Sequence, residues 1–199
     1  MVHIVAINGS YRDDGLTDHL VASATRELAE AGASIDVVTL RDCPIEFCLN
    51  CRECMREPGS KPGHCVLEDG MQHIINRMEQ ADAFIFASPT NFSTVTALFK
   101  RFMERLAPYG YWPASQAGPT FRKESLPAKK AMLIGSGAAP GILGRYIFNT
   151  IRSMKVAANT INATPVSTLY VGFSDYRSKH GDSPALERKI RRKAMKLLH

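Results

Sequence analysis

The alternation of apolar, strand-like runs with amphipathic helical segments constrains the fold of this chain more than any other feature. Five runs are mostly apolar, as in strands buried on both faces: residues 2–7, 34–40, 81–89, 131–137 and 165–173. Four segments carry apolar side chains every three or four positions, as amphipathic helices do: residues 16–31, 71–78, 95–106 and 143–154. We expect Gly32 to end the first helix, Asp69 to cap the second, and Ser183 and Pro184 to open a fifth.

Strands that alternate with helices predict an α/β fold, with a parallel sheet covered by helices on both faces. Right-handed crossovers and five strands favour the flavodoxin-like, doubly wound order 2-1-3-4-5. We expect one domain over residues 1–199, because the length suits one core and no repeat is visible. Two segments interrupt the alternation: a cysteine-rich insertion after the second strand, at about 43–69, and a long loop rich in Pro and Gly, at about 107–129. Loops of that length inside a compact domain are usually functional.

Charge and hydropathy exclude several classes of protein. The first residues lack a basic leader, and no apolar run approaches the roughly 18 residues that cross a bilayer, so we expect a cytoplasmic protein without membrane contact. The net charge is +6, but residues 183–199 alone carry six Lys and Arg against one Glu. This clustering indicates the solvated face of one helix and not a nucleic-acid-binding protein. The alternative is a docking patch for an acidic electron carrier or polyanion.

The loop after the first strand, NGSYRDDGLT, suits an anion. In the predicted strand order, ligands bind beyond the carboxyl ends of the first and third strands, where this loop lies. It offers tight turns, hydroxyls and a charged side chain before a helix N-terminus: Gly9, Ser10, Arg12, Gly15 and Thr17. The loop is neither a dinucleotide fingerprint nor a Walker A loop. A helix capped by polar turn residues is the alternative, and Asp13 and Asp14 oppose an anion unless they point to solvent.

Two further loops should reach the same end of the sheet. The loop after the third strand places amide and hydroxyl groups beside the ring of Phe92, in the sequence Thr90, Asn91, Phe92, Ser93. Such groups can hydrogen-bond the edge of a flat heterocycle while the ring packs on its face. Ser93 or Thr94 is alternatively the cap of the next helix. Gly135 and Gly137, after the fourth strand, allow the backbone to approach the same ligand closely.

These three loops, in this order, resemble the NADPH-dependent FMN reductase family of flavodoxin-like proteins. GSYRDDGLT is similar to the family's phosphate loop, SPTNFSTVTALFKRFMERL to the segment after its third strand, and GSG follows the fourth strand. The inserted CLNCRECM…GHCVLEDGM resembles the iron–sulfur flavoprotein branch of that family. The resemblance runs from residue 4 to about 137 and more loosely beyond.

The resemblance implies FMN as the cofactor and the residues that bind it. The phosphate would lie among Ser10, Arg12, Gly15, Leu16 and Thr17, where Leu16 offers only its backbone N–H. The isoalloxazine ring would lie among Pro89, Thr90, Asn91, Phe92, Gly135, Ser136 and Gly137, although Asn-Phe stands where the family usually has Tyr-Phe. FMN would carry the chemistry without a catalytic side chain, with NAD(P)H as a possible co-substrate. We expect small-molecule or protein electron donors and acceptors, and a homo-oligomer, either a dimer or a tetramer.

The insertion contains four closely spaced thiols. Cys48, Cys51 and Cys54 recur every third residue, and Cys65 follows. Such a run is the common signature of a 4Fe–4S cluster, with Cys65 as the fourth ligand. Zinc is an alternative that favours two C-x2-C pairs, and free or redox-active thiols are another. His64 can replace one cysteine as a ligand, and we expect Cys43 to be a small buried residue.

The leading functional hypothesis is therefore an FMN-dependent oxidoreductase that carries a 4Fe–4S cluster. A second hypothesis is an NAD(P)H-dependent FMN or quinone reductase without a cluster. A third, of a different class, is a zinc-containing, non-catalytic binding module on a flavodoxin-like scaffold.

Overall fold

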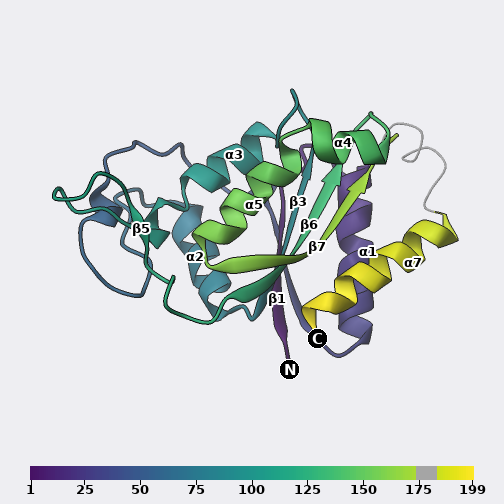
Figure 1. Ribbon diagram of the computed structural model, residues 1–199, viewed down its shortest axis with the longest axis horizontal. Helices are drawn as coiled ribbons and strands as arrows, with labels where there is room; N and C mark the ends of the chain where they lie inside the picture. Colours follow the sequence, from purple (N-terminus) through teal and green to yellow (C-terminus); the bar gives the residue numbers. More distant parts are fainter. Residues whose placement is uncertain (174–182) are drawn as a thin grey trace.

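The computed structural model describes residues 1–173 and 183–199, without the side chains of Ile142 and Leu143. Its centre is a five-stranded parallel sheet in the order β2-β1-β3-β6-β7 (Figure 1). The strands are β1 His3–Asn8, β2 Ser34–Thr39, β3 Ala83–Pro89, β6 Lys129–Ser136 and β7 Ala163–Val171. Because β6 and β7 are the fourth and fifth strands of this sheet, the predicted order 2-1-3-4-5 is confirmed.

Helices cover both faces of the sheet, also as predicted. The helices α1 Leu16–Glu30 and α7 Pro184–Ala194 lie to the right of the sheet in Figure 1. To its left lie α2 Gly70–Gln80, α3 Ala97–Glu104 and α5 Thr150–Thr160. A hydrophobic core lies on each face of the sheet. Alternate residues of one strand belong to the two cores, because successive side chains of a strand point to opposite faces. Phe84 and Phe86 pack against the left-hand helices, whereas Ile85 belongs to the core with α1 and α7.

The predicted signals at the helix ends are confirmed. Asp69 Oδ1 accepts a hydrogen bond from Met71 N at 2.9 Å at the start of α2. Gly32, with φ of +89°, follows the end of α1, and Ser183 caps α7 before Pro184. The apolar stripe of α7 is buried, so its basic side chains lie on the solvated face. No helix in the described parts of the chain is long and apolar enough to span a bilayer.

Residues 143–154 do not form the single helix that their periodicity predicts. They belong to α4 Gly141–Ile147 and to α5, separated by Phe148 in an extended conformation and by Asn149. The N–H of Asn149 donates to Ser93 O at 2.7 Å, outside any helix. This contact with the loop after β3 explains the break. The side chain of Leu143, on which the prediction partly depended, lies outside the described side chains.

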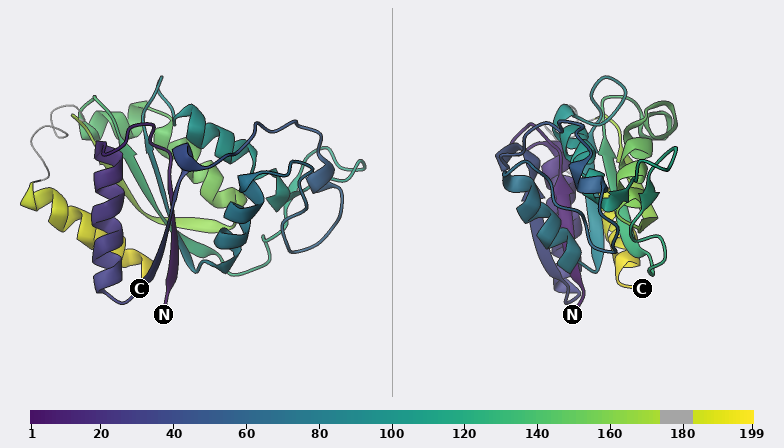
Figure 2. Two further views of the ribbon diagram at one scale, coloured as in Figure 1. Left: turned by 180° about the vertical axis from the view of Figure 1, so that it is seen from behind. Right: turned by 90° about the vertical axis from the view of Figure 1, so that its left-hand side faces the viewer.

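The long loop at 107–129 has more regular structure than predicted. It contains a 3-10 turn, η3 Ala107–Tyr109, and an antiparallel pair, β4 Gly110–Tyr111 with β5 Thr120–Phe121. The loop packs against the cysteine-rich insertion, and Figures 1 and 2 show both segments together at one end of the molecule. Trp112 N donates to Met55 O at 2.8 Å, and Arg122 Nη2 donates to Cys54 O at 3.1 Å. The two interruptions of the alternation therefore form one substructure.

The two ends of the cysteine-rich insertion, after β2 and before α2, are in contact with each other. After β2 the chain passes through a 3-10 turn, η1 Leu40–Asp42, and it returns at the start of α2. Gly70 N donates to Pro44 O at 2.9 Å, which closes the insertion at its base. Inside it, η2 Glu53–Met55 carries one of the four thiols. The insertion is thus a loop with its ends joined, placed between the strand and the helix of an otherwise regular βαβ crossover.

Candidate functional site

Three loops at the carboxyl ends of β1, β3 and β6 surround a pocket of about 460 Å³, a volume typical of small-molecule sites. Ten of the twelve residues predicted to bind FMN line it: Ser10, Arg12, Gly15, Leu16, Thr17, Pro89, Thr90, Asn91, Ser136 and Gly137. Phe92 and Gly135 are not among the lining residues. These ten residues run from Ser10 to Gly137 in the chain. They meet in one pocket because the parallel strands end at the same edge of the sheet.

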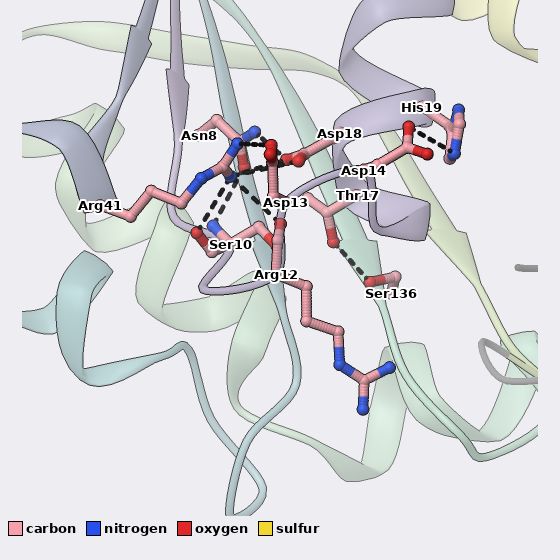
Figure 3. A network of polar contacts seen from close by, with 10 residues as sticks. All are labelled: Asn8, Ser10, Arg12, Asp13, Asp14, Thr17, Asp18, His19, Arg41 and Ser136. Carbon is pink, nitrogen blue, oxygen red and sulfur yellow. Dashed lines mark hydrogen bonds and ion pairs between the residues drawn. The ribbon is translucent and has the colours of Figure 1, made fainter.

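Buried hydroxyl groups join the loops across this pocket (Figure 3). Thr17 Oγ1 and Ser136 Oγ lie 2.9 Å apart, which connects the start of α1 to the end of β6. Ser10 Oγ donates to Arg12 O at 3.1 Å, and Ser10 N donates to Asn8 Oδ1 at 3.0 Å. These contacts hold the first loop in a defined conformation, with its hydroxyl groups close to the pocket.

The N-terminus of α1 has no side-chain cap. Its N-cap residue is Gly15, whereas Asp69 caps α2 and Thr96 caps α3 through side-chain oxygens. The first N–H groups of a helix lack partners inside the helix, and they carry the positive end of its dipole. An uncapped N-terminus that lines a pocket is therefore suited to an anion.

Two acidic residues of the first loop, Asp13 and Asp14, are among the residues that line the pocket, but their side chains are largely exposed to solvent. The side chain of Asp13 is 93% exposed and lies 2.8 Å from Arg41 Nη2. The side chain of Asp14 is 89% exposed and lies 3.3 Å from His19 Nε2. Asp18, on the first turn of α1, pairs with Arg41 Nη1 at 3.1 Å. These carboxylates are turned to solvent or neutralised, which meets the condition set for an anion in this loop.

Arg41 is a residue of this site that the sequence interpretation missed. It lies in η1, and its Nη1 also donates to Arg12 O at 3.1 Å, which braces the loop (Figure 3). Burial acts to lower the pKa of Arg41, but the hydrogen bond and charge of Asp18 outweigh it and raise the pKa. Because β2 lies beside β1, a residue directly after β2 ends at the same sheet edge. The predicted strand order was therefore a signal that could have identified Arg41.

The second loop forms a tight turn that exposes Phe92. Asn91 N donates to Thr94 O at 2.9 Å, and Phe92 and Ser93 have φ of +45° and +66°. The side chain of Phe92 is fully exposed and lies outside the pocket. Neither Ser93 nor Thr94 caps the next helix, because Thr96 Oγ1 accepts from Phe99 N at 3.1 Å and fills that role.

Gly135 serves packing and does not line the pocket. A Cβ at this position would lie 2.7 Å from the ring of Tyr170, so only glycine lets the ring pack there. Tyr170 Oη lies 2.8 Å from Thr90 Oγ1, which in turn lies 2.8 Å from Thr150 Oγ1. Tyr170 therefore supports the pocket from behind Thr90. It is another residue that the sequence interpretation missed, because β7 contributes no loop to the predicted site.

A second pocket is lined by all four cysteines of the insertion. Cys48, Cys51, Cys54 and Cys65 share it with mostly apolar neighbours, and it has no lining residue in common with the first pocket. Cys43 lies elsewhere: its Sγ donates to Thr39 O at 3.3 Å, and it packs against the core but is only partly buried, whereas the sequence predicted a buried residue. The structure thus separates the four candidate ligands from the fifth cysteine.

The donor set of this pocket suits a thiolate-bound cluster. Burial, and then the charges of Cys65, Cys48 and Cys51, raise the pKa of Cys54 to about 11, so the four thiols interact. The N–H of Asn50, whose φ of +53° turns the backbone, donates to Cys48 Sγ at 3.4 Å. In residues 1–173 and 183–199 no three His, Cys, Asp or Glu side chains are placed to hold a metal ion. In a cubane each thiolate binds a different iron, so its ligands need not converge on one point.

Comparisons with known proteins agree with this architecture. Residues 2–176 match the family model of NADPH-dependent FMN reductase. An iron–sulfur flavoprotein of Archaeoglobus fulgidus is 34% identical over 109 residues, which are 55% of this chain and 47% of that protein. One of Methanocaldococcus jannaschii is 33% identical over 105 residues, 53% and 52% of the two chains. The chain thus spans about half the length of the curated relatives it matches.

Solved structures confirm the flavodoxin-like fold. An FMN-dependent NADH-azoreductase from Bacillus anthracis, in complex with FMN, has a TM-score of 0.68 at 10% identity, and the match covers 100% of both chains. At such identity the likeness shows the fold alone.

Proposed function

The chain belongs to the NADPH-dependent FMN reductase family, and from this premise we propose that it is an FMN-dependent oxidoreductase that also carries a 4Fe–4S cluster. One observation carries the first half of the proposal. A single pocket gathers three loops, an uncapped helix N-terminus and ten of the residues expected around FMN. That combination suits a ligand with an anionic end and a flat polar ring.

Each side of the pocket has a separate part in binding FMN. The free N–H groups of α1, with Ser10 and Thr17, would hold the phosphate, and Arg41 would keep that loop in place. The loops at Thr90 and Gly137 would bracket the ring, with Tyr170 fixing the position of Thr90. Bound FMN supplies the capacity to take a hydride or an electron pair. We propose that no side chain acts as an acid, a base or a nucleophile, and that the protein binds and orients.

The second half of the proposal assigns Cys48, Cys51, Cys54 and Cys65 as ligands of the cluster. Its support is that these thiols line one pocket and that a backbone N–H already points at Cys48 Sγ. The chain also bounds the backbone distance between Arg41 and Cys48. Arg41 contacts the phosphate loop, and the seven residues from there to Cys48 extend at most about 25 Å.

Anaerobic purification followed by absorption spectroscopy, and by FMN and metal analysis, tests the proposal. We expect about one FMN and about four irons per chain. FMN without iron would leave the flavoprotein but remove the cluster. One zinc without FMN would replace the proposal with the non-catalytic zinc module.

The second candidate is an NAD(P)H-dependent flavin or quinone reductase without a cluster. The observation that favours it is that the described thiols form no group arranged to hold a metal ion. In this case the thiols would be free or redox-active. The two candidates separate in one measurement, because the cluster-free enzyme would oxidise NAD(P)H at full FMN occupancy with no iron present.

We also propose that the chain forms a homo-oligomer, as a dimer or a tetramer, and that its partners are small-molecule or protein electron carriers. The support is that three large side chains, Phe92, Tyr146 and Ile147, are each exposed. The loop of Phe92 is joined to the α4–α5 junction through the bond from Asn149 N to Ser93 O, so these side chains belong to neighbouring segments. Sedimentation of the FMN-loaded protein tests the proposal, and a monomer at micromolar concentration would refute it.

A further inference from the structure

Arg105, at the end of α3, is a buried cation. It is the largest fully buried side chain of the described chain, with 2% of the residue exposed. A buried charge destabilises a protein strongly unless it is paired and hydrogen-bonded. The position of Arg105 therefore requires an explanation beyond packing, because an aliphatic side chain would fill the same space at lower cost.

Most of its hydrogen bonds fix Arg105 to the base of the cysteine-rich insertion. Nη1 lies 2.5 Å from Asp69 Oδ2 and 2.9 Å from Glu46 O, and Nη2 lies 3.0 Å from Asp69 Oδ1. Asp69 also accepts from the N–H groups of Glu46 and Met71, at 2.7 and 2.9 Å. The carboxylate is thus fully hydrogen-bonded, and it holds the guanidinium in one orientation.

One remaining contact reaches a candidate cluster ligand. Arg105 Nη2 lies 3.6 Å from Cys65 Sγ, within hydrogen-bonding distance for sulfur. The sulfur of Cys48 has a different kind of donor from that of Cys65, because it accepts a hydrogen bond from the neutral backbone N–H of Asn50 at 3.4 Å. A cationic donor therefore faces one sulfur of the pocket, in an environment where few water molecules screen its charge.

We propose that Arg105 is a positioning residue that raises the reduction potential of the cluster by donating a charge-assisted hydrogen bond to Cys65 Sγ. This inference rests on the proposed function. Reduction adds one electron from a reductant such as the reduced flavin and breaks no bond at Cys65, while the guanidinium stays protonated. The reduced cluster carries one more negative charge, so a nearby cation and N–H donor stabilise it more than the oxidised form.

The test compares three variants by iron analysis and by redox titration of the cluster, followed by electron paramagnetic resonance. Arg105→Gln should lower the ratio of reduced to oxidised cluster at a fixed potential at least tenfold, which is 59 mV for a one-electron couple. Asp69→Asn should raise that ratio, because it removes the charge that neutralises Arg105 and keeps a residue able to cap α2. Arg101→Gln is the matched control: Arg101 lies one turn earlier on α3, over the ring of Phe47, and the ratio should stay unchanged.

The outcomes separate this inference from the proposed function. An unchanged potential in Arg105→Gln, with about four irons retained, would overturn the inference and leave the cluster standing. An equal shift in Arg101→Gln would also overturn it, because the effect would then be one of general charge. Wild-type protein without iron would remove the proposed cluster and the inference together.

A folding defect in Arg105→Gln would not leave the question open. The double variant Arg105→Gln, Asp69→Asn removes both partners of the buried pair, which is tolerated better than the loss of one. It should show a ratio at least tenfold below that of Asp69→Asn alone. If the double variant also loses iron, the single variant Asp69→Asn decides, and a potential at or below the wild-type value there refutes the inference.

Discussion

The two pockets lie on loops that leave the same end of the sheet, yet they are built by different means. The proposed flavin pocket is formed where β1, β3 and β6 end, so the strand order alone brings its residues together. The cysteine pocket is formed by an insertion that packs on another irregular loop, through bonds such as Arg122 Nη2 to Cys54 O. The first site takes its geometry from the sheet. The second depends on contacts between two segments outside the main sheet, so we expect it to be disrupted more easily, and without loss of the first.

The largest expected effect tests that separation. Replacing Cys48, Cys51, Cys54 or Cys65 singly by Ser should reduce the iron content from about four per chain to nearly none, because a cubane requires all four thiolates. FMN should remain bound at wild-type stoichiometry. Cys43→Ser is the matched control and should keep both, since its sulfur lies outside the pocket. Loss of FMN in the four variants would contradict the independence of the two sites.

A smaller effect should come from acid, through the buried pair of Asp69 and Arg105. Burial acts to raise the pKa of Asp69, but hydrogen bonds from Arg105 and two backbone amides hold this pKa below its usual range. A carboxyl with a depressed folded pKa contributes stability above its unfolded pKa and loses it as the pH falls through the folded pKa.

The free energy of unfolding of the wild-type protein should therefore exceed that of Asp69→Asn at neutral pH, and this difference should shrink below about pH 4. The size of this loss is the difference between the unfolded and the folded pKa of Asp69, at about 1.4 kcal/mol for each unit. Chemical unfolding at several pH values measures the difference. A constant difference between pH 7 and the acid limit would contradict the assignment of this pair.

The contacts of Arg122 allow a test of what holds the cysteine pocket. Arg122 Nε donates to Pro108 O at 2.9 Å and to Gly110 O at 3.0 Å, and its Nη2 reaches Cys54 O. Arg122→Gln should destabilise the insertion by about 2 kcal/mol, as for hydrogen bonds to charged groups. Amide hydrogen exchange should show this loss in the insertion but not in β1 or β3.

The control for this prediction is Arg56→Gln. Arg56 is in the same insertion but makes an exposed ion pair with Glu53, at 2.8 Å. Its loss should change stability by less than about 1 kcal/mol. Equal effects of the two substitutions would mean that Arg122 does not hold the pocket together.

On the flavin side, Arg12→Ala and Thr17→Ala should each weaken FMN binding by about 1 to 3 kcal/mol, the value of a charge-assisted hydrogen bond. Flavin fluorescence measures the affinity, and the iron content should not change. Unchanged affinity in both variants would place the phosphate elsewhere.

The smallest effect is expected at Phe92. The exposed side chain makes Phe92→Ala neutral for stability, within about 0.5 kcal/mol. If the ring does not contact the flavin, as its place outside the pocket indicates, FMN affinity should not change either. A tenfold weaker affinity would instead support the contact expected from the sequence.

The sequence allowed prediction of the features that depend on periodicity and on strand order. The sheet, both helix layers and seven of the pocket residues follow from local patterns combined with one topological rule, whereas Leu16, Pro89 and Ser136 were expected only from the resemblance to a family. Arg41, Tyr170 and Arg105 were missed because each acts through a partner that is distant in the chain. The break between α4 and α5 was missed for the same reason, since it depends on the bond from Asn149 to Ser93. The spacing of apolar residues predicts which face of a helix is buried, but it does not predict which backbone carbonyl of a neighbouring loop will accept a hydrogen bond.

The closed base of the insertion suggests that most of its sequence can be exchanged for another. Because Gly70 N meets Pro44 O, and Asp69 binds Glu46 N and Arg105, both ends of the insertion are fixed, and we expect the residues between Glu46 and Asp69 to tolerate changes of length without movement of β2 or α2. Loop length affects stability weakly, by about 0.6 kcal/mol for each doubling. If the insertion holds the proposed cluster, a protein of this architecture would gain or lose a second redox centre by an exchange of sequence at this junction, while the proposed flavin pocket would keep its geometry. The same junction offers an engineer a position at which other metal-binding loops can be grafted beside a flavin.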